Sequence, residues 1–450
     1  MKYFDKGIDE QKVKAISAKK NEPKWMLDYR ITAYKEFIKS DLPEWGPDIS
    51  DISFDNIIYH ASDDQEITND WREIPPDIKK QFDDLGIPEH ERAVLAGVST
   101  QYESEIIYHR LRERYVNYGI VFDSIENGLR DHEGLFKRYF GKLVNYDENK
   151  FTALNSSVWS GGSFVYIPKG VKMDLPIETY FRINADRMGQ FERTLIIADE
   201  GSEVHYIEGC TAPQYLNSSL HSAVVEIFAL KGSKVRYTTL QNWSKNVYNL
   251  VTKRAIAEAD ASVEWLDINI GSKVTMKYPT VVLNGKRASG SVNSIAMSSS
   301  EQTIDSGAKM IHKAPDTHSI IKSTTISKDD GVSVFRGLID ISKSARNSRS
   351  YVKCDNVLLS DRSIARSYPV IKVKNDSSVA EHEAIASNIS KEQLSYLSSR
   401  GLNEDLSREL ILSGYFSEFN EQLPLEYSIE LERIIQLFNK GVDEEGHKRK

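Results

Sequence analysis

A long run of short β-type segments between Phe151 and Ala386 most limits what this chain can fold into. Apolar residues occupy alternate positions in each segment, and Gly, Ser, Asn and Asp separate the segments. Small-residue turns recur, and their serines at positions 202, 233, 262 and 289 step by 31, 29 and 27 residues. That step suits one coil of a β-solenoid, whose rungs bury their apolar faces by stacking. We predict a mainly β fold with a solenoid core over residues 151–386, although the pattern alone leaves a sandwich or jelly roll open.

Helical signals dominate before this core. Apolar residues follow one helical stripe in the stretch from Lys24 to Phe37 and again in the stretch from Gln101 to Tyr118. We therefore expect residues 1–150 to form an N-terminal helical (α/β) region.

Helical signals return after the core, and residues 387–450 are expected to form a C-terminal helical domain. Ser390 is a predicted helix N-cap, and Gly401 and Gly414 are each predicted to end a helix. A last amphipathic helix is expected from Leu425 to Lys440. Its apolar stripe packs on the protein itself or offers a surface to a partner.

Composition and charge exclude several classes of function. The formal net charge is −8 and aromatic residues are not clustered with Lys and Arg, so nucleic-acid binding is not expected. No apolar stretch approaches the ~20 residues of a membrane span, and the first residues lack a signal peptide, which indicates a cytoplasmic protein. No phosphate-binding loop is present, so the chain itself should not hydrolyse nucleotide.

The two cysteines are too few for a Cys-rich metal site or a disulfide framework. Cys354 precedes the acidic segment Glu381-His382-Glu383 by about one solenoid coil, so stacking should bring the two together. A thiolate, carboxylates and an imidazole form a ligand set suited to iron or zinc. Solvated surface charge and a small buried cysteine are the alternative interpretation.

Cys210 lies in the string Glu208-Gly209-Cys210-Thr211-Ala212-Pro213, where a strand is expected to run out into a turn. It is either an apolar filler of the core or a nucleophilic thiol accessible at a rung corner. A nucleophilic role requires a nearby cation that lowers its pKa, and the sequence does not identify one.

Long strings in the chain resemble the SufB/SufD family of the SUF system for iron–sulfur cluster assembly, and in particular its scaffold branch, SufB. The resemblance extends from about Pro23 to Ile435. It is strongest in the strings SGGSFVYIPKG (160–170), GQFERTLII (189–197), EGCTAP (208–213), QNWS (241–244), NIGSKVTMKYP (269–279), GAKMIH (307–312) and EHEA (381–384), and in residues 351–359.

The resemblance implies a right-handed parallel β-helix with helical ends, and a scaffold rather than an enzyme. It implies a transient iron–sulfur cluster and allows a reduced flavin as electron donor. The implied partners are a SufC-type ATPase, a SufD-type paralogue or a second copy of the chain, and a cysteine desulfurase or sulfur-transfer protein. Many family members carry an N-terminal Cys-rich motif that is absent from this sequence.

The same resemblance assigns roles to individual residues. It makes Cys354 the cluster-assembly thiol, with Glu383 as the carboxylate that shares its site. We expect Glu381 or His382 to support that site. It makes Cys210 the first sulfur acceptor. Positions in the β-helix interior are implied for Arg182, Asn184, Gln241 and Trp243. A carbohydrate-active β-helix enzyme and an inert structural solenoid are the competing functions, but the expected acidic calcium cluster of a lyase is not found in the sequence.

Overall fold

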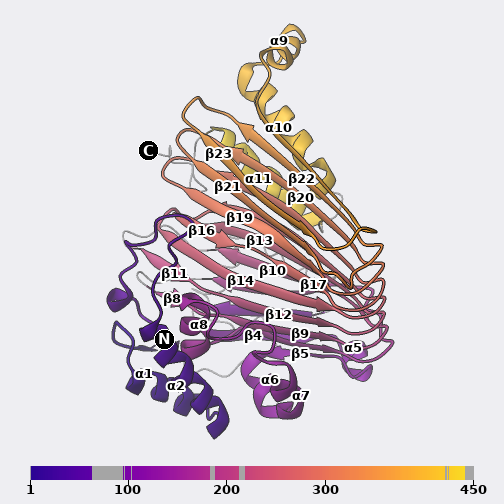
Figure 1. Cartoon of the computed structure of the whole chain (residues 1–450). Helices are drawn as coiled ribbons and strands as arrows, with labels where there is room; N and C mark the ends of the chain where they lie inside the picture. Colours follow the sequence, from indigo (N-terminus) through magenta and orange to yellow (C-terminus); the bar gives the residue numbers. More distant parts are fainter. Residues whose placement is uncertain are drawn as a thin grey trace.

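The computed structural model describes residues 2–62, 95, 97–102, 104–182, 188–211, 218–420, 423 and 425–440. Its centre is a β-solenoid of about seven turns that spans residues 164–388. Figure 1 shows the strands stacked as rungs, with α1 and α2 near the start of the stack and the C-terminal helices near its other end. The predicted solenoid is confirmed.

Each turn of the solenoid contributes strands to two facing layers. Sheet 1 contains the core strands β10 (Glu203–Thr211), β13 (Lys234–Trp243), β15 (Ser262–Gly271), β18 (Ser289–Ser298), β20 (His318–Ser327), β22 (Arg349–Leu358) and β24 (Val379–Asn388). Sheet 2 contains β9 (Arg193–Ala198), β12 (Val224–Ala229), β14 (Val247–Ala257), β16 (Val274–Lys277), β17 (Thr280–Leu283), β19 (Thr303–His312), β21 (Val332–Ile341) and β23 (Ile364–Val373). These strands pair in parallel with the rung before and after, as a solenoid requires.

Left-handed backbone at one corner of the coil explains the repeated turn signal. Six successive turns there each place one residue at a φ between 57° and 71°: Gly201, Gly232, Asp260, Arg287, Asp316 and Asn347. Gly, Asn and Asp enter this region at least cost, which accounts for the small and polar residues between segments. The serine spacing is only approximately the true register: Ser262 pairs with Ser289, but Lys234 rather than Ser233 pairs with Ser262.

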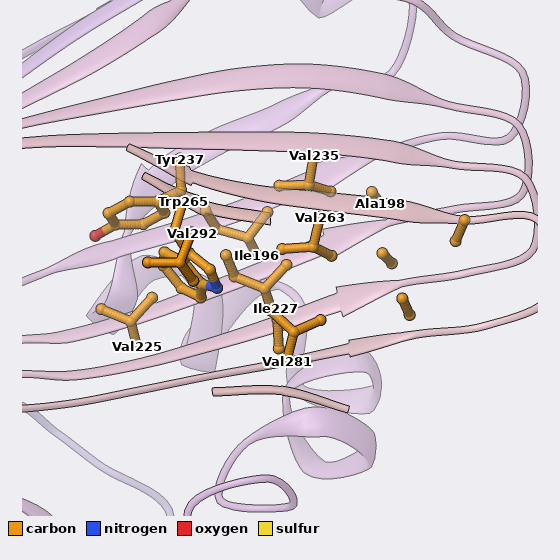
Figure 2. Close-up of a cluster of buried hydrophobic side chains, with 14 of the residues drawn as sticks. Ile196, Ala198, Val225, Ile227, Val235, Tyr237, Val263, Trp265, Val281 and Val292 are labelled. Carbon is orange, nitrogen blue, oxygen red and sulfur yellow. The ribbon is translucent and has the colours of Figure 1, made fainter. Parts of the chain in front are cut away.

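An apolar stack fills the interior between the two sheets. Figure 2 shows part of it, with Val235, Tyr237, Val263, Trp265 and Val292 from sheet 1 facing Ile196, Val225, Ile227 and Val281 from sheet 2. The rings of Tyr206, Tyr237 and Trp265 stack along three rungs with centroid separations of 4.9 Å. These positions alternate along each strand, as the sequence pattern predicts.

The N-terminal region is only partly as expected. The predicted helix is present as α2 (Lys24–Lys39), which packs with α1 (Glu10–Lys19) and α8 (Lys150–Val158). The predicted helix from Gln101 to Tyr118 is wrong. That stretch contains the end of β3 (Gly97–Tyr102), then β4 (Glu105–Leu111) and the short α5 (Glu113–Asn117).

In this stretch, strand pairing outweighs the helical spacing of the apolar residues. β3 and β4 form an antiparallel hairpin, and β3 pairs in parallel with β7 (Ile177–Arg182) at the start of sheet 1. The run Ile106-Ile107-Tyr108 has strong β propensity. β5 (Val121–Ser124) similarly pairs with β6 (Ser163–Ile167) in sheet 2, and α6 (Ile125–Asp131) and α7 (Glu133–Tyr139) follow it.

The described part of the chain ends with three helices: α9 (Lys391–Ser399), α10 (Glu404–Asn420) and α11 (Leu425–Lys440). Ser390 caps α9 as predicted, and Gly401 follows its end with φ 86°. Gly414 does not end a helix, because α10 continues through it with Leu412, Phe416 and Phe419 buried.

The last two helices cover the outer face of sheet 1. Buried residues of α11, including Leu431, Ile434 and Phe438, share one apolar cluster with Ile268 and Ile295 of the sheet. α9 has no buried residue and projects beyond the last rungs (Figure 1). Within the described part of the chain, none of the helices has the length and apolarity needed to cross a bilayer.

Candidate functional site in the solenoid interior

Two neighbouring inward columns of sheet 1 are mostly polar rather than apolar. The pairing register stacks the first column as Glu208, Thr239, Asp267, Ser294, Ser323 and Cys354. It stacks the second as Cys210, Gln241, Asn269, Ala296, Thr325 and Asn356. All twelve side chains are buried. Both cysteines of the chain therefore face the same closed interior, on two neighbouring columns of one sheet.

Buried charges from sheet 2 meet these columns. Lys277 Nζ lies 2.9 Å from Asp267 Oδ2, and Lys253 Nζ lies 3.3 Å from Asp267 Oδ1. Burial opposes ionisation of Asp267, yet the two ammonium groups lower its pKa to about 2. Burial lowers the pKa of Lys277 to about 8 against the attraction of Asp267. The network is thus a compact set of compensating charges, which burial requires.

Cys210 is enclosed by this network. It is the eighth residue of β10, faces inward and is 2% exposed, so the expected placement in an accessible turn is wrong. Its thiol donates to Glu208 Oε1 at 3.7 Å, and Gln241 Nε2 lies 3.9 Å from Sγ. Burial and the carboxylates of Glu208 and Glu192 raise the pKa of the Cys210 thiol, while Lys253 and Lys277 act in the opposite direction. These two lysines are the cations that the sequence alone did not identify.

Two of the four predicted interior residues lie beside Cys210. Gln241 is its rung neighbour, and Trp243 shares an apolar cluster with it and packs on the His221 ring at 4.6 Å. Arg182 ends β7 in register with Thr211, but the structure describes only its backbone. Asn184 lies outside the described residues.

Cys354 lies on β22, one rung before the end of the solenoid, and is fully buried. Its Sγ is 3.5 Å from both Ser367 Oγ and Asn356 Nδ2. Burial raises the pKa of the Cys354 thiol, and the contacts with Ser367 and Asn356 counter part of that rise. Burial therefore favours the neutral thiol of Cys354 over the thiolate.

The segment Glu381-His382-Glu383 lies on β24 beside β22, so the predicted juxtaposition by one coil is present. The register pairs Cys354 with Ala384, and Lys353 with Glu383. Because side chains alternate, Cys354 and His382 are on the inner face and Glu381 and Glu383 on the outer face. Glu383 accepts a hydrogen bond from the Tyr351 hydroxyl at 2.6 Å. Among the described residues, no three His, Cys, Asp or Glu side chains are arranged to hold a metal ion.

The sequence interpretation missed most of the interior charges. Glu192, Glu208, Lys253, Asp267 and Lys277 are buried between the sheets. A signal for one of them was present, because Lys253 alternates with Val251, Ala255 and Ala257 on the inward face of β14. A lysine in phase with apolar inward positions indicates a buried cation.

The family follows from two sequence comparisons. The family model for the SUF system FeS cluster assembly SufBD core domain matches residues 181–415, and that for the SufBD protein N-terminal region matches residues 9–179. The chain belongs to the SufBD family. It is 50% identical over 437 residues to an iron–sulfur cluster assembly SufBD family protein of Staphylococcus saprophyticus, covering 97% of this chain and 94% of the relative. A Staphylococcus aureus SufBD family protein matches with the same identity and coverage.

Membership gives this SufBD chain a role in SUF-system iron–sulfur cluster assembly. It replaces the carbohydrate-active alternative. The relatives carry the family name only, so the match does not separate SufB from SufD, and no finding supports the flavin that the resemblance allowed.

Proposed function

We propose that this SufBD protein is a SufB-type scaffold that accepts sulfur at Cys210 and builds a transient iron–sulfur cluster at Cys354. The observation that carries the proposal is the burial of both cysteines on neighbouring inward columns of sheet 1. The first column places Thr239, Asp267, Ser294 and Ser323 between Glu208 and Cys354. A polar interior between two thiols suits the passage of a sulfur species that apolar packing would exclude.

Sulfur acceptance at Cys210 is a thiol–persulfide exchange. The Cys210 thiolate attacks the outer sulfur of a donor persulfide, an S–S bond forms at Cys210, and the donor's S–S bond breaks to release the donor as a thiolate. Glu208 Oε1, at 3.7 Å, is placed to take the proton of the Cys210 thiol. A cysteine desulfurase or its sulfur-transfer protein is the proposed donor.

In this proposal, a partner chain at the open end of the solenoid supplies the cluster ligands that the site around Cys354 lacks. β23 and β24 end the described order of the two sheets, so each leaves one edge without a neighbour there. Exposed apolar side chains lie on this last rung: Ile364, Tyr368, Val370, Ile371, Val373, Val379 and Ile385. Open edges of this kind favour strand addition. A SufD-type paralogue or a second copy is the proposed occupant, which places Cys354 one rung from the interface.

The geometry favours His382 over Glu383 as the ligand that accompanies Cys354, because only His382 shares its face of the sheet. Glu383 and Glu381 reach a cluster at Cys354 only if the last rung rearranges or if the cluster bridges the sheet edge. ATP-driven closure of partner ATPase subunits is the proposed cause of such a rearrangement.

The proposed docking surface for a SufC-type ATPase is on α9 and α10. The sequence pointed to the apolar stripe of α11, but Leu431, Ile434 and Ile435 of that stripe are buried against sheet 1. Among the side chains that the structure describes in the C-terminal helices, the exposed large apolar residues are instead Tyr396, Leu406, Leu410 and Tyr415. Removal of all three helices is therefore a poor test, since it uncovers an apolar sheet face.

The test of the scaffold role is anaerobic reconstitution with iron, a cysteine desulfurase and cysteine, followed by ultraviolet–visible spectroscopy. Cys354→Ser should abolish cluster absorbance and change thermal stability by no more than about 1 kcal/mol. Cys210→Ser should abolish sulfur loading from the desulfurase but leave cluster formation from free sulfide. Wild-type cluster yield in Cys354→Ser, or loss of its β-sheet circular dichroism, would remove Cys354 from the site.

A further inference from the structure

We propose that Lys277 and Asn249 are positioning residues that turn the side-chain amide of Gln241 so that its NH₂ group faces the sulfur of Cys210. The inference rests on the proposed role of Cys210 as sulfur acceptor. It adds two residues of sheet 2 to a site whose thiol lies on sheet 1.

The orientation of the Gln241 amide follows from the donors that meet it. Lys277 Nζ and Asn249 Nδ2 each lie 2.9 Å from the same atom, Gln241 Oε1. An ammonium group has no acceptor, so the atom it contacts must be the carbonyl oxygen. The NH₂ group is then left on the opposite side, where Nε2 lies 3.9 Å from Cys210 Sγ.

The side-chain amide of Asn249 is itself oriented by His221. The pair formed by His221 Nδ1 and Asn249 Oδ1 is 2.8 Å long, which leaves Asn249 Nδ2 to face Gln241. Lys277 is anchored by Asp267 Oδ2 at 2.9 Å. Two independently held donors thus fix one oxygen, and reversal of the amide would place two donor groups against the Gln241 NH₂.

The orientation matters because a sulfur anion at Cys210 is poorly solvated. Burial is the first cause that raises the pKa of this thiol, and Glu208 and Glu192 raise it further. An amide NH₂ stabilises a thiolate or persulfide anion as a neutral hydrogen-bond donor, whereas a reversed amide would repel it. Among the described side chains, the titratable groups that surround the thiol are Glu192, Glu208, His221, Tyr237, Lys253, Asp267 and Lys277.

The test uses the Cys354→Ser protein, in which Cys210 is the single thiol. The second-order rate of Cys210 modification by methyl methanethiosulfonate is measured by intact mass between pH 6 and 10. Asn249→Leu and Lys277→Met should each slow modification across this pH range, by about tenfold at pH 7.5 for Lys277→Met. Asn249→Leu decides between charge and orientation, because it leaves every ionisable side chain in place.

Gln241→Met completes a double-mutant cycle with Asn249→Leu. If Asn249 acts through the amide, its substitution has no further effect once Gln241 is Met. Equal slowing in both backgrounds, or unchanged profiles in Asn249→Leu and Lys277→Met, would overturn the inference. Lys309→Met, a partly buried lysine on the outer face of β19, is the matched control and should leave the profile unchanged.

The experiment distinguishes failure of the inference from unfolding of a variant and from failure of the proposed function. The double variant Lys277→Met/Asp267→Asn removes a buried pair together, so it keeps the test available if the single lysine variant unfolds. If the Cys354→Ser protein accepts no sulfur from a desulfurase and cysteine, the proposed function fails. The methanethiosulfonate profiles still decide the orientation of the amide in that case.

Discussion

Glu192→Gln should remove the loss of folding stability that wild-type protein suffers when the buried Glu192 carboxyl ionises near and above neutral pH. Glu192 is 1% exposed, and within the described residues neither of its carboxylate oxygens has a hydrogen-bond partner. His221 Nε2 lies 3.5 Å from Oε1. Burial raises the pKa of Glu192 from 4.5 to about 7, against the attraction of His221. Glutamine has the same shape and no charge to bury.

The sign and size of the expected change in stability follow from proton linkage. The folded chain binds more protons than the unfolded chain between pH 4.5 and about 7, so the stability from this group is full below pH 4.5 and is lost as the pH rises through 7. At about 1.4 kcal/mol per pKa unit, the loss between pH 5 and pH 8 is about 2 to 3 kcal/mol. The glutamine side chain introduced by the substitution cannot titrate, so the variant escapes this loss.

The assay is urea unfolding followed by circular dichroism, for both proteins at pH 5 and at pH 8. Comparing the proteins at each pH cancels the other titrating groups. The free energy of unfolding of the variant relative to wild type should be higher at pH 8 than at pH 5 by about 2 to 3 kcal/mol. Glu203→Gln is the control and should show no such contrast, because this side chain on β10 is 39% exposed. An equal difference at both pH values for Glu192→Gln would refute the reasoning.

Two further matched pairs test the architecture. If α10 is the docking surface as proposed, Leu406→Arg on its exposed side should weaken copurification with a SufC-type ATPase at unchanged melting temperature. Leu431→Ala in α11 should instead lower the free energy of unfolding by about 2–5 kcal/mol and increase proteolysis of the C-terminal helices. Gly271→Ala should lower the melting temperature more than Gly170→Ala: both residues have positive φ, but only at Gly271 would the new Cβ meet a backbone atom, the Trp243 carbonyl oxygen, at 1.6 Å. A similar melting temperature for the two glycine variants would contradict the close approach of these rungs.

The solenoid was predictable because every rung must bury its inward residues against the next rung, so the same sequence pattern recurs on each rung. Alternation fixes which residues face inward, and the left-handed corner residue fixes where each rung turns. The helix predicted from Gln101 to Tyr118 failed because Ile106, Ile107 and Leu111 suit a helical stripe and a strand equally. The pairing of their strand, β4, with β3 decides between the two, and β3 in turn pairs with β7. The C-terminal helices were predictable, but the stripe of α11 did not reveal whether its partner was internal.

The candidate site was predictable only in part. Family strings pointed to both cysteines, to Gln241 and to Trp243, and Cys354 indeed lies beside the strand of Glu383. The sequence did not show that strand alternation separates Cys354 from that carboxylate. Contacts between the two sheets, such as Lys277 with Asp267, depend on how the layers face one another. The spacing of residues within one strand does not show which residues of the facing sheet they will contact.

Apolar and polar positions are divided along each strand of sheet 1, and this division argues for an interface at Cys354. The first inward positions of β10, β13 and β15 carry the apolar stack, and the later ones carry the polar columns. In the column that contains Cys354, the last ionisable carboxylate is Asp267, and only Ser294 and Ser323 lie between it and the thiol. The buried lysines therefore compensate charge near Cys210 and not near Cys354. If Cys354 holds the cluster as proposed, the remaining ligands and the charge balance come from the open end of the solenoid, where the proposed partner chain binds.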